Sequence, residues 1–354
     1  MKKIVALREW GSWLRRKGKR FVIGVGKDEK VEIPAENVEM ILIMSSSSLS
    51  SSSLKLAVEK KIPVFFTYPS GYPYAALFPM VSTGSARTRM EQYLSRLDER
   101  GLQLAKAFAE GKLLNQYYLL RTFARYRRRK RDKVAEEIYR KSAEIKQALD
   151  DVRKVEGFLS FAIRSKLMNL EGRGAEANWE AFSLLIPERY GEFRREKRGA
   201  RDVVNSLLNY GYGFLLAKVT TALFYVGLDP YAGFLHVDRA GRESLSLDLM
   251  EEFRQQVVDR VVLRLILTNQ IKSDAVNDKG LIRREVVATL LDALRERLQT
   301  FVYFRERRMK LGTAIKRQAR AIVRHVLRSE RYSPFYLRYW VALSHHLRHN
   351  ERLT

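Results

Sequence analysis

The sequence contains no cysteine, so disulfide bonds, zinc–thiolate sites and thiol nucleophiles are all excluded. It also lacks an uncharged apolar run of about 18 residues, the length that a membrane-spanning helix needs. The N-terminal stretch MKKIVALREW interrupts its apolar residues with Arg8 and Glu9, which leaves no signal-peptide core. We therefore expect a cytoplasmic protein with no membrane association.

Acidic residues are scarce relative to basic ones. The 354 residues include 66 Lys and Arg against 40 Asp and Glu, which gives a net charge of +26. Nucleic-acid phosphate is the expected counter-ion, although a solvated basic surface without a nucleic-acid role gives the same composition. Apolar residues make up 46% of the chain, enough to bury one large core or two modest ones.

The first 80 residues are expected to form mainly strands. Apolar runs at 38–44 and 62–68 are typical of buried strands, and residues 54–60 between them have helical spacing. The serine tract at 45–53 is either a flexible linker or, as the flanking apolar segments favour, a tight turn and a serine-capped helix start. Further strands are predicted over 6–13, 20–25 and 30–33, with a basic turn at 15–19.

From residue 88 onward the apolar spacing is almost entirely helical. We predict a helix break at Gly111 and helices over 90–108, 113–124, 134–149, 155–168, 175–185, 203–226, 245–267, 281–300 and 309–327. The expected fold class is α+β, with a small β-rich domain over 1–80 and a linker over 81–88. A large all-α catalytic and DNA-binding domain follows over 89–354.

A carboxylate–imidazole–carboxylate set lies in the second half of the chain. Asp248 and Glu251 are spaced to share one helix face, whereas Glu252 is rotated by roughly 100° from Glu251. His236 is the only one of five histidines close in sequence to this acidic helix, and Glu171 opens a stretch of small residues. One imidazole and two carboxylates suit Mg²⁺ or Mn²⁺. On a basic chain this set suggests phosphodiester chemistry, although acidic residues near a helix start also have a purely structural explanation.

Several motifs resemble one known family. VNSLLNYGYGFLLAKVTTAL, GLDPYAGFLH and SLSLDLMEEFR, in this order, closely resemble the integrase subunit of the CRISPR spacer-acquisition complex, a CRISPR-associated endonuclease. LMNLEGRGAEANWEAF resembles the glutamate motif of that family, and IPVFFTYPSGYPYA also fits. The similarity covers most of residues 1–330. It implies that Glu171, His236 and Glu251 ligate the metal and that Asp248 lies beside them.

The resemblance also implies a reaction and partners. The family joins the 3′-hydroxyl of a prespacer to the leader–repeat junction of a CRISPR array by transesterification, as part of adaptive antiviral defence. Branched DNA or water in the same site gives disintegration or nuclease reactions. The implied assembly is a homodimer, paired through the β-rich domain, that joins a small ferredoxin-fold adaptation protein in a heterohexamer.

Basic runs are the expected contacts to DNA phosphates. The predicted set comprises Arg125, Arg127, Arg128, Arg129 and Lys130 in one run, together with Arg242 and Arg254 near the acidic helix. The resemblance places Tyr212 near the active site, either as a substrate contact or as a core aromatic. The aromatic and basic C-terminal segment is interpreted either as a docking or DNA-contact segment or as structural packing.

Two alternative functions remain open from the sequence. A stand-alone repair nuclease for branched DNA would use the same chemistry. A non-catalytic scaffold that bridges DNA would not need the site, but the complete set of Glu171, His236 and Glu251 argues against it.

Overall fold

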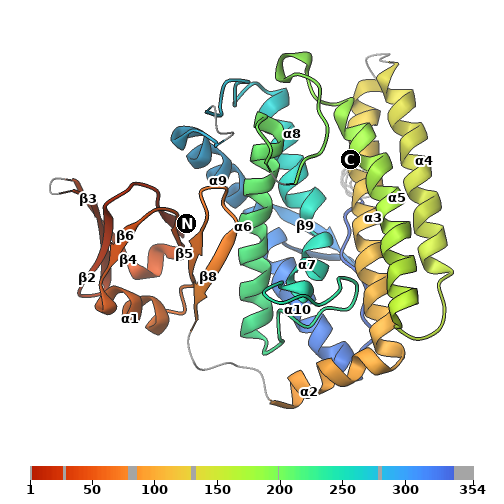
Figure 1. Cartoon of the computed structure of the whole chain (residues 1–354), viewed down its shortest axis with the longest axis horizontal. Helices are drawn as coiled ribbons and strands as arrows, with labels where there is room; N and C mark the ends of the chain where they lie inside the picture. The colour runs from red at the N-terminus through yellow and green to blue at the C-terminus, as the bar shows by residue number, and fades with distance from the viewer. Residues whose placement is uncertain are drawn as a thin grey trace, which may run out of the picture.

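A computed structural model describes residues 2–26, 29–78, 86–128, 133–197, 199–277 and 281–338 of the chain. An N-terminal part made mainly of strands is followed by a mostly helical part, as Figure 1 shows. This arrangement confirms the expected α+β fold. Within the described residues, no helix is both long enough and apolar enough to cross a membrane.

Two four-stranded sheets form the N-terminal part. One has the strand order β1-β5-β7-β8 and the other β4-β3-β2-β6. The central strands β5 and β7 pair in parallel, consistent with the continuous apolar runs that predicted them. The elements are β1 (Lys3–Leu7), β2 (Ser12–Lys17), β3 (Arg20–Val25), β4 (Glu29–Pro34), β5 (Val38–Ile43), β6 (Ser47–Leu49), α1 (Ser51–Glu59), β7 (Val64–Thr67) and β8 (Pro73–Leu77).

The serine tract is ordered, so the linker interpretation is wrong and the capping prediction is confirmed. Ser50 is the N-cap of α1, and the Ser53 backbone N–H donates to its hydroxyl at 3.2 Å. Residues of β6 pair in parallel with β2. The predicted turn at 15–19 is also too long, because β2 continues to Lys17 and the chain reverses at Gly18.

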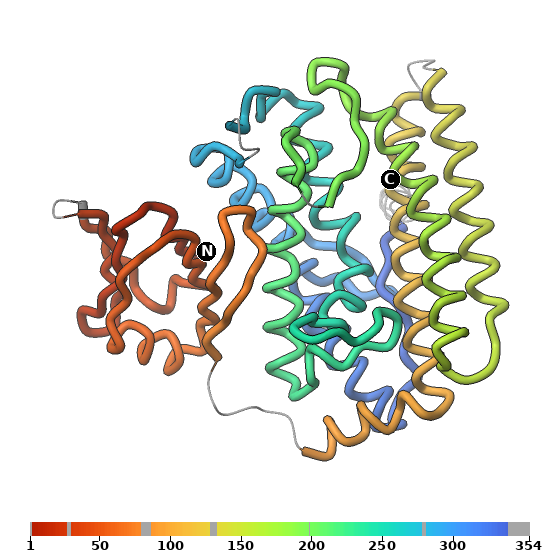
Figure 2. The backbone as a smooth tube through the Cα atoms, viewed as in Figure 1, coloured from red at the N-terminus to blue at the C-terminus, as the bar shows by residue number. Residues whose placement is uncertain are grey.

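The helical part surrounds α6, which is buried along most of its length. Figures 1 and 2 show α6 between strand β8 on one side and the layer of α3, α4 and α5 on the other. The elements are α2 (Ala86–Leu94), α3 (Glu99–Arg128), α4 (Val134–Arg153), α5 (Phe161–Ser183), α6 (Val203–Tyr225), α7 (Ser244–Glu251), α8 (Arg260–Leu267), α9 (Arg284–Gln299), β9 (Phe301–Phe304), β10 (Arg307–Lys310) and α10 (Leu311–Val326). The β9–β10 hairpin was not anticipated from the sequence.

The predicted helix break at Gly111 is wrong, because α3 runs through it without interruption. A Cβ atom at Gly111 would meet Glu252 and Pro334, so the glycine serves a close approach of neighbouring segments rather than a turn. The helix predicted to start at residue 155 begins instead at Phe161, with Ser160 as its N-cap. It continues to Ser183, which merges two predicted helices into one.

The helix predicted over 245–267 is divided. Helix α7 ends at Glu251, a π-helical turn spans Gln255–Asp259, and α8 follows. Such π turns often accompany functional sites, because they locally redirect side chains. Here the interruption lies directly after the acidic segment SLSLDLMEE.

The N-terminal part has an apolar core of its own, which includes Leu14 and Phe21, and a few of its residues also join the larger core of the helical part. Met40, Met44 and Phe65 belong to the same buried cluster as the helical residues. Close packing is visible at Gly213 of α6, where a Cβ atom would overlap the backbone carbonyl of Gly71. This contact holds the loop between β7 and β8 beside α6, where it borders the site described next.

Candidate active site

A cavity of about 1090 Å³ opens between the helices and the β7–β8 loop. Its lining comes from α3, α5, α6, α7 and the segments around them. Glu171, His236 and Glu251, the three residues expected to act together, all line it. The tertiary structure therefore brings into one hollow a glutamate from α5, a histidine from a loop and a glutamate from the end of α7.

Glu171 and Glu251 are joined by one ammonium group. Lys112 of α3 forms ion pairs with Glu171 and with Oε2 of Glu251, the latter at 3.0 Å. The exposed side-chain fractions are 12% for Lys112, 16% for Glu171 and 3% for Glu251. Glu171 lies in the middle of α5 and faces the cavity, whereas the sequence analysis left it between two predicted helices.

His236 is held by the carboxylate of Asp248. The Asp248 Oδ1 atom lies 2.7 Å from His236 Nδ1 and accepts the backbone N–H of His236 at 2.8 Å. Its Oδ2 atom accepts the backbone N–H groups of Phe234 at 2.6 Å and Leu235 at 3.0 Å. The contact assigns the proton to Nδ1 and leaves Nε2 as the nitrogen able to coordinate or accept a proton.

Asp248 is therefore placed to orient His236. It is fully buried, and both of its oxygens already accept hydrogen bonds from the histidine loop. The sequence analysis placed Asp248 beside the metal ligands and not among them, and in the structure its carboxylate contacts the histidine loop.

Glu252 points away from the cavity. Its carboxylate accepts hydrogen bonds from Tyr332 Oη at 2.8 Å, Phe335 N at 2.8 Å and Gln318 Nε2 at 3.0 Å. Burial raises the pKa of Glu252 to about 8. Neighbouring residues on a helix are rotated by roughly 100° from each other, so Glu251 points into the cavity while Glu252 points toward the C-terminal segment.

Positive side chains surround Glu251. Arg254 donates from Nη1 to Glu251 Oε1 at 2.7 Å. Burial alone would raise the pKa of Glu251, but the adjacent Arg254 and Lys112 charges outweigh it and lower that pKa far below its usual range. Burial lowers the pKa of Lys197, and the neighbouring Arg254 and Lys112 charges lower it further.

Tyr212 of α6 is buried beside this cluster. Its hydroxyl donates to Asp259 in the π turn, and its ring lies 4.0 Å from the Arg254 guanidinium and 5.5 Å from that of Arg195. Burial raises the pKa of Tyr212 well above its ordinary value. The ring of Tyr212 is buried and lines the cavity, and its hydroxyl is held by Asp259, which fits the core interpretation; a contact with substrate stays a prediction.

The side chains of Glu171, His236 and Glu251 are of types that bind divalent cations, but they are not arranged around one common point. Among the described residues, no group of three His, Cys, Asp or Glu side chains has the geometry to hold a metal ion. One imidazole nitrogen and two carboxylates nevertheless border the same cavity, and hard or borderline cations prefer these ligand types. The carboxylates of Glu171 and Glu251 both contact the Lys112 ammonium, so they lie close enough together to bind one cation between them.

The predicted DNA-contact residues fall in two places. Arg242 and Arg254 line the cavity, whereas Arg125 and Arg127 lie near the end of α3, about 20 Å along the helix from Lys112. Arg128 is the last residue of α3, and Arg129 and Lys130 lie outside the described residues. Sequence reasoning did not identify Lys112, Arg195 or Lys197 as residues of the cavity.

The described part of the C-terminal segment packs into the core. Phe335 and Leu337 are buried, and their backbone N–H groups donate to Glu252 and Asn115 respectively. Structural packing is therefore confirmed for residues 332–337, and the docking or DNA-contact interpretation stays a prediction. Residues 339–354 lie outside the described part of the chain.

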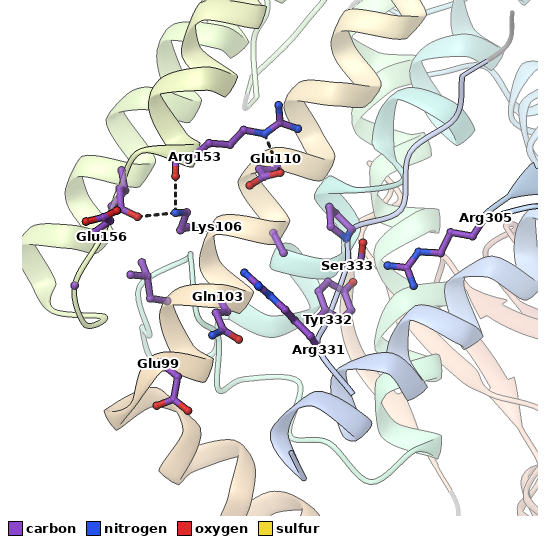
Figure 3. A pocket seen from close by; sticks show the side chains of 15 residues that line it. Glu99, Gln103, Lys106, Glu110, Arg153, Glu156, Arg305, Arg331, Tyr332 and Ser333 are labelled. Carbon is purple, nitrogen blue, oxygen red and sulfur yellow. Dashed lines mark hydrogen bonds and ion pairs between the residues drawn. The ribbon is translucent and has the colours of Figure 1, made fainter. Parts of the chain in front are cut away.

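A second hollow, of about 660 Å³, lies between the first half of α3, the α4–α5 connection and the C-terminal segment (Figure 3). Charges of both signs line it, including Glu99, Lys106 and Arg153. Lys106 donates to the backbone carbonyls of Arg153 and Val155 at 2.7 and 2.6 Å. The hollow contains none of the residues predicted for catalysis.

Comparisons with known proteins identify one family. The family model described as CRISPR associated protein Cas1 matches residues 5–296. CRISPR-associated endonuclease Cas1 1 of Archaeoglobus fulgidus is 38% identical over 318 residues, which cover 86% of this chain and 90% of that relative.

Solved structures share the fold. A casposase bound to integration product matches with a TM-score of 0.79 and 22% identity, over 94% of this chain and 93% of that chain. A Cas6-RT-Cas1–Cas2 complex matches with a TM-score of 0.75 and 19% identity, over 94% of this chain and 36% of that chain. The resemblance seen in the sequence motifs is thereby confirmed: the chain belongs to the Cas1 family of CRISPR-associated proteins.

Proposed function

We propose that this protein is a metal-dependent DNA endonuclease and integrase that inserts prespacer DNA into a CRISPR array. The observation that carries the proposal is the single cavity where Glu171, His236 and Glu251 meet on a chain of net charge +26. The family supports it, since the Archaeoglobus relative is named an endonuclease and the casposase neighbour was solved bound to integration product.

The reaction is a transesterification at phosphorus. The 3′-hydroxyl of the prespacer attacks a phosphodiester at the leader–repeat junction, a new P–O bond forms, and the bond to the departing 3′-oxygen breaks. The proton leaves the attacking hydroxyl and the departing oxygen gains one, so no covalent enzyme intermediate is required.

Each residue of the site has a role in this reaction. Glu171, His236 and Glu251 would hold Mg²⁺ or Mn²⁺, which supplies charge neutralisation at the phosphate and stabilises the departing oxygen. Asp248 keeps the His236 ring in one orientation through Nδ1. Arg242, which lines the same cavity, is positioned to bind phosphate oxygens of DNA.

The partners proposed are double-stranded and branched DNA, a second copy of the chain and the small ferredoxin-fold adaptation protein. The Cas6-RT-Cas1–Cas2 complex supports the last of these, since a Cas1 unit is assembled there with Cas2. We assign dimerisation to the β-rich residues 1–80. Light scattering tests the homodimer, which should give a mass near twice the 41.2 kDa of one chain.

A strand-transfer assay tests the proposed activity. A short duplex with free 3′-hydroxyls is incubated with a supercoiled plasmid that carries a repeat, Mn²⁺ or Mg²⁺ and the small partner protein. Joining should require the metal and should disappear in His236→Ala, while DNA affinity stays within a few-fold of wild type. Cleavage of branched DNA without joining would instead indicate a stand-alone repair nuclease, and DNA binding with neither activity would indicate a scaffold.

A further inference from the structure

Lys112 occupies the position between the two glutamates that the proposed metal would take. Its ammonium contacts Glu171 of α5 and Glu251 of α7, so one positive charge from α3 links carboxylates on two other helices. The ammonium is therefore held as a charged group inside the cavity.

The local charges balance without a metal. The carboxylates of Glu171 and Glu251 carry two negative charges, and Lys112 and Arg254 bring two positive charges into direct contact with them. A third cation, Lys197, also borders the cavity. A divalent ion entering this arrangement would meet no uncompensated negative charge, and it would be repelled strongly at such short range and low solvent exposure.

We propose that Lys112 holds the place of the divalent metal in the metal-free protein and that metal binding moves its ammonium out of the carboxylate pair. The inference rests on the proposed function, because it takes Glu171 and Glu251 as metal ligands. Displacement needs no movement of α3, since the lysine side chain is a flexible four-carbon stem with a compact charged end. Arg254 differs, because its guanidinium is also packed over the Tyr212 ring and so is restrained.

Two consequences follow from this exchange. The glutamates do not repel each other before metal arrives, so the site keeps its shape in the metal-free protein. Metal affinity is then set by a competition, because the ion must replace two existing ion pairs with Lys112. Removal of the ammonium should therefore tighten metal binding rather than weaken it.

The test measures Mn²⁺ binding to the full-length protein without DNA, by the electron paramagnetic resonance signal of the free ion. Lys112→Met removes the charge and keeps an unbranched side chain. Lys106→Met is the matched control, because Lys106 lies on the same helix but contacts backbone carbonyls at the other hollow (Figure 3). We expect the Mn²⁺ Kd to fall at least tenfold in Lys112→Met and to stay within about twofold in Lys106→Met. An unchanged or higher Kd in Lys112→Met would overturn the inference.

Thermal unfolding in EDTA and in Mn²⁺ gives a second readout that remains informative if Lys112→Met is unstable. The variant should melt below wild type in EDTA, since its buried glutamates lack their shared partner, and Mn²⁺ should raise its Tm more than that of wild type. Failure of Mn²⁺ to restore the fold would also count against the inference.

A third variant, Glu251→Gln, separates failure of the inference from failure of the proposed function. Mn²⁺ binding that is lost in Glu251→Gln but unchanged in Lys112→Met would leave the metal site intact and reject only the role of Lys112. Absence of Mn²⁺ binding in wild type and in Lys112→Met alike would reject the metal site itself, and the inference with it.

Discussion

Replacing Asp248 by asparagine tests whether Asp248 orients His236 or binds the metal itself. Each carboxylate oxygen of Asp248 accepts two hydrogen bonds, one pair from His236 and the other from the Phe234 and Leu235 backbone. An asparagine side chain keeps one oxygen, so two buried donors would face an NH₂ group that cannot accept from them. Hydrogen bonds to a charged acceptor contribute about 1.5–3 kcal/mol each, so the two lost bonds amount to about 3–6 kcal/mol.

Urea unfolding followed by circular dichroism measures this change. Asp248→Asn should lower the free energy of unfolding by about 3–6 kcal/mol and weaken Mn²⁺ binding roughly 10–100-fold through the released His236 ring. Asp238→Asn is the control in the same loop, because Asp238 is exposed and pairs with Arg96 at the surface. Asp238→Asn should lower the free energy of unfolding by less than about 1 kcal/mol. An Asp248→Asn protein as stable as wild type that no longer binds Mn²⁺ would refute the reasoning and make Asp248 a ligand.

Three further predictions address the DNA surface, the C-terminal segment and the core. Arg125→Gln combined with Arg127→Gln should reduce the slope of log DNA affinity against log salt by up to about 2, and an unchanged slope would remove the end of α3 from the interface. The Tyr332 backbone N–H donates to His325 Nδ1 at 3.0 Å, and burial lowers the pKa of His325. Below about pH 6.5 the unfolded chain therefore binds more protons at this position, so stability should fall as the pH drops, and His325→Gln should flatten that part of the pH profile measured by urea unfolding. Gly213→Ala should lower the Tm by several degrees, corresponding to about 1–3 kcal/mol, because the added methyl group meets backbone, and a Tm equal to wild type in calorimetry would show that α6 can shift at little cost.

Much of the architecture follows from local sequence patterns. Period-two and continuous apolar runs identify the main strands, and helical spacing identifies most helices of the second part. The sequence predictions are wrong where contacts with distant segments, and not the local pattern, explain a glycine or a local motif. Gly111 was expected to end a helix, but it lies inside α3, where other segments approach too closely for a side chain.

The C-terminal segment was ambiguous for a similar reason. Its aromatic and basic residues suit either DNA or a core, and composition alone does not distinguish these environments. The structure shows residues 332–337 packed against the core, where the carboxylate of Glu252, directly after α7, and the amide oxygen of Asn115 on α3 accept hydrogen bonds from the segment.

The sequence by itself determined the residue types of the site. His236 and Glu251 are close along the chain, Asp248 and Glu251 are spaced to share one helix face, and the order of the motifs is sufficient to show the family resemblance. Only the tertiary structure decided that Lys112 joins Glu171 to Glu251, because each of the three comes from a different helix. Helical periodicity shows which face of a helix is buried, but it does not show which helix lies opposite that face. Contacts between distant segments are set by the packing of the whole core, and this packing placed a lysine between the two glutamates.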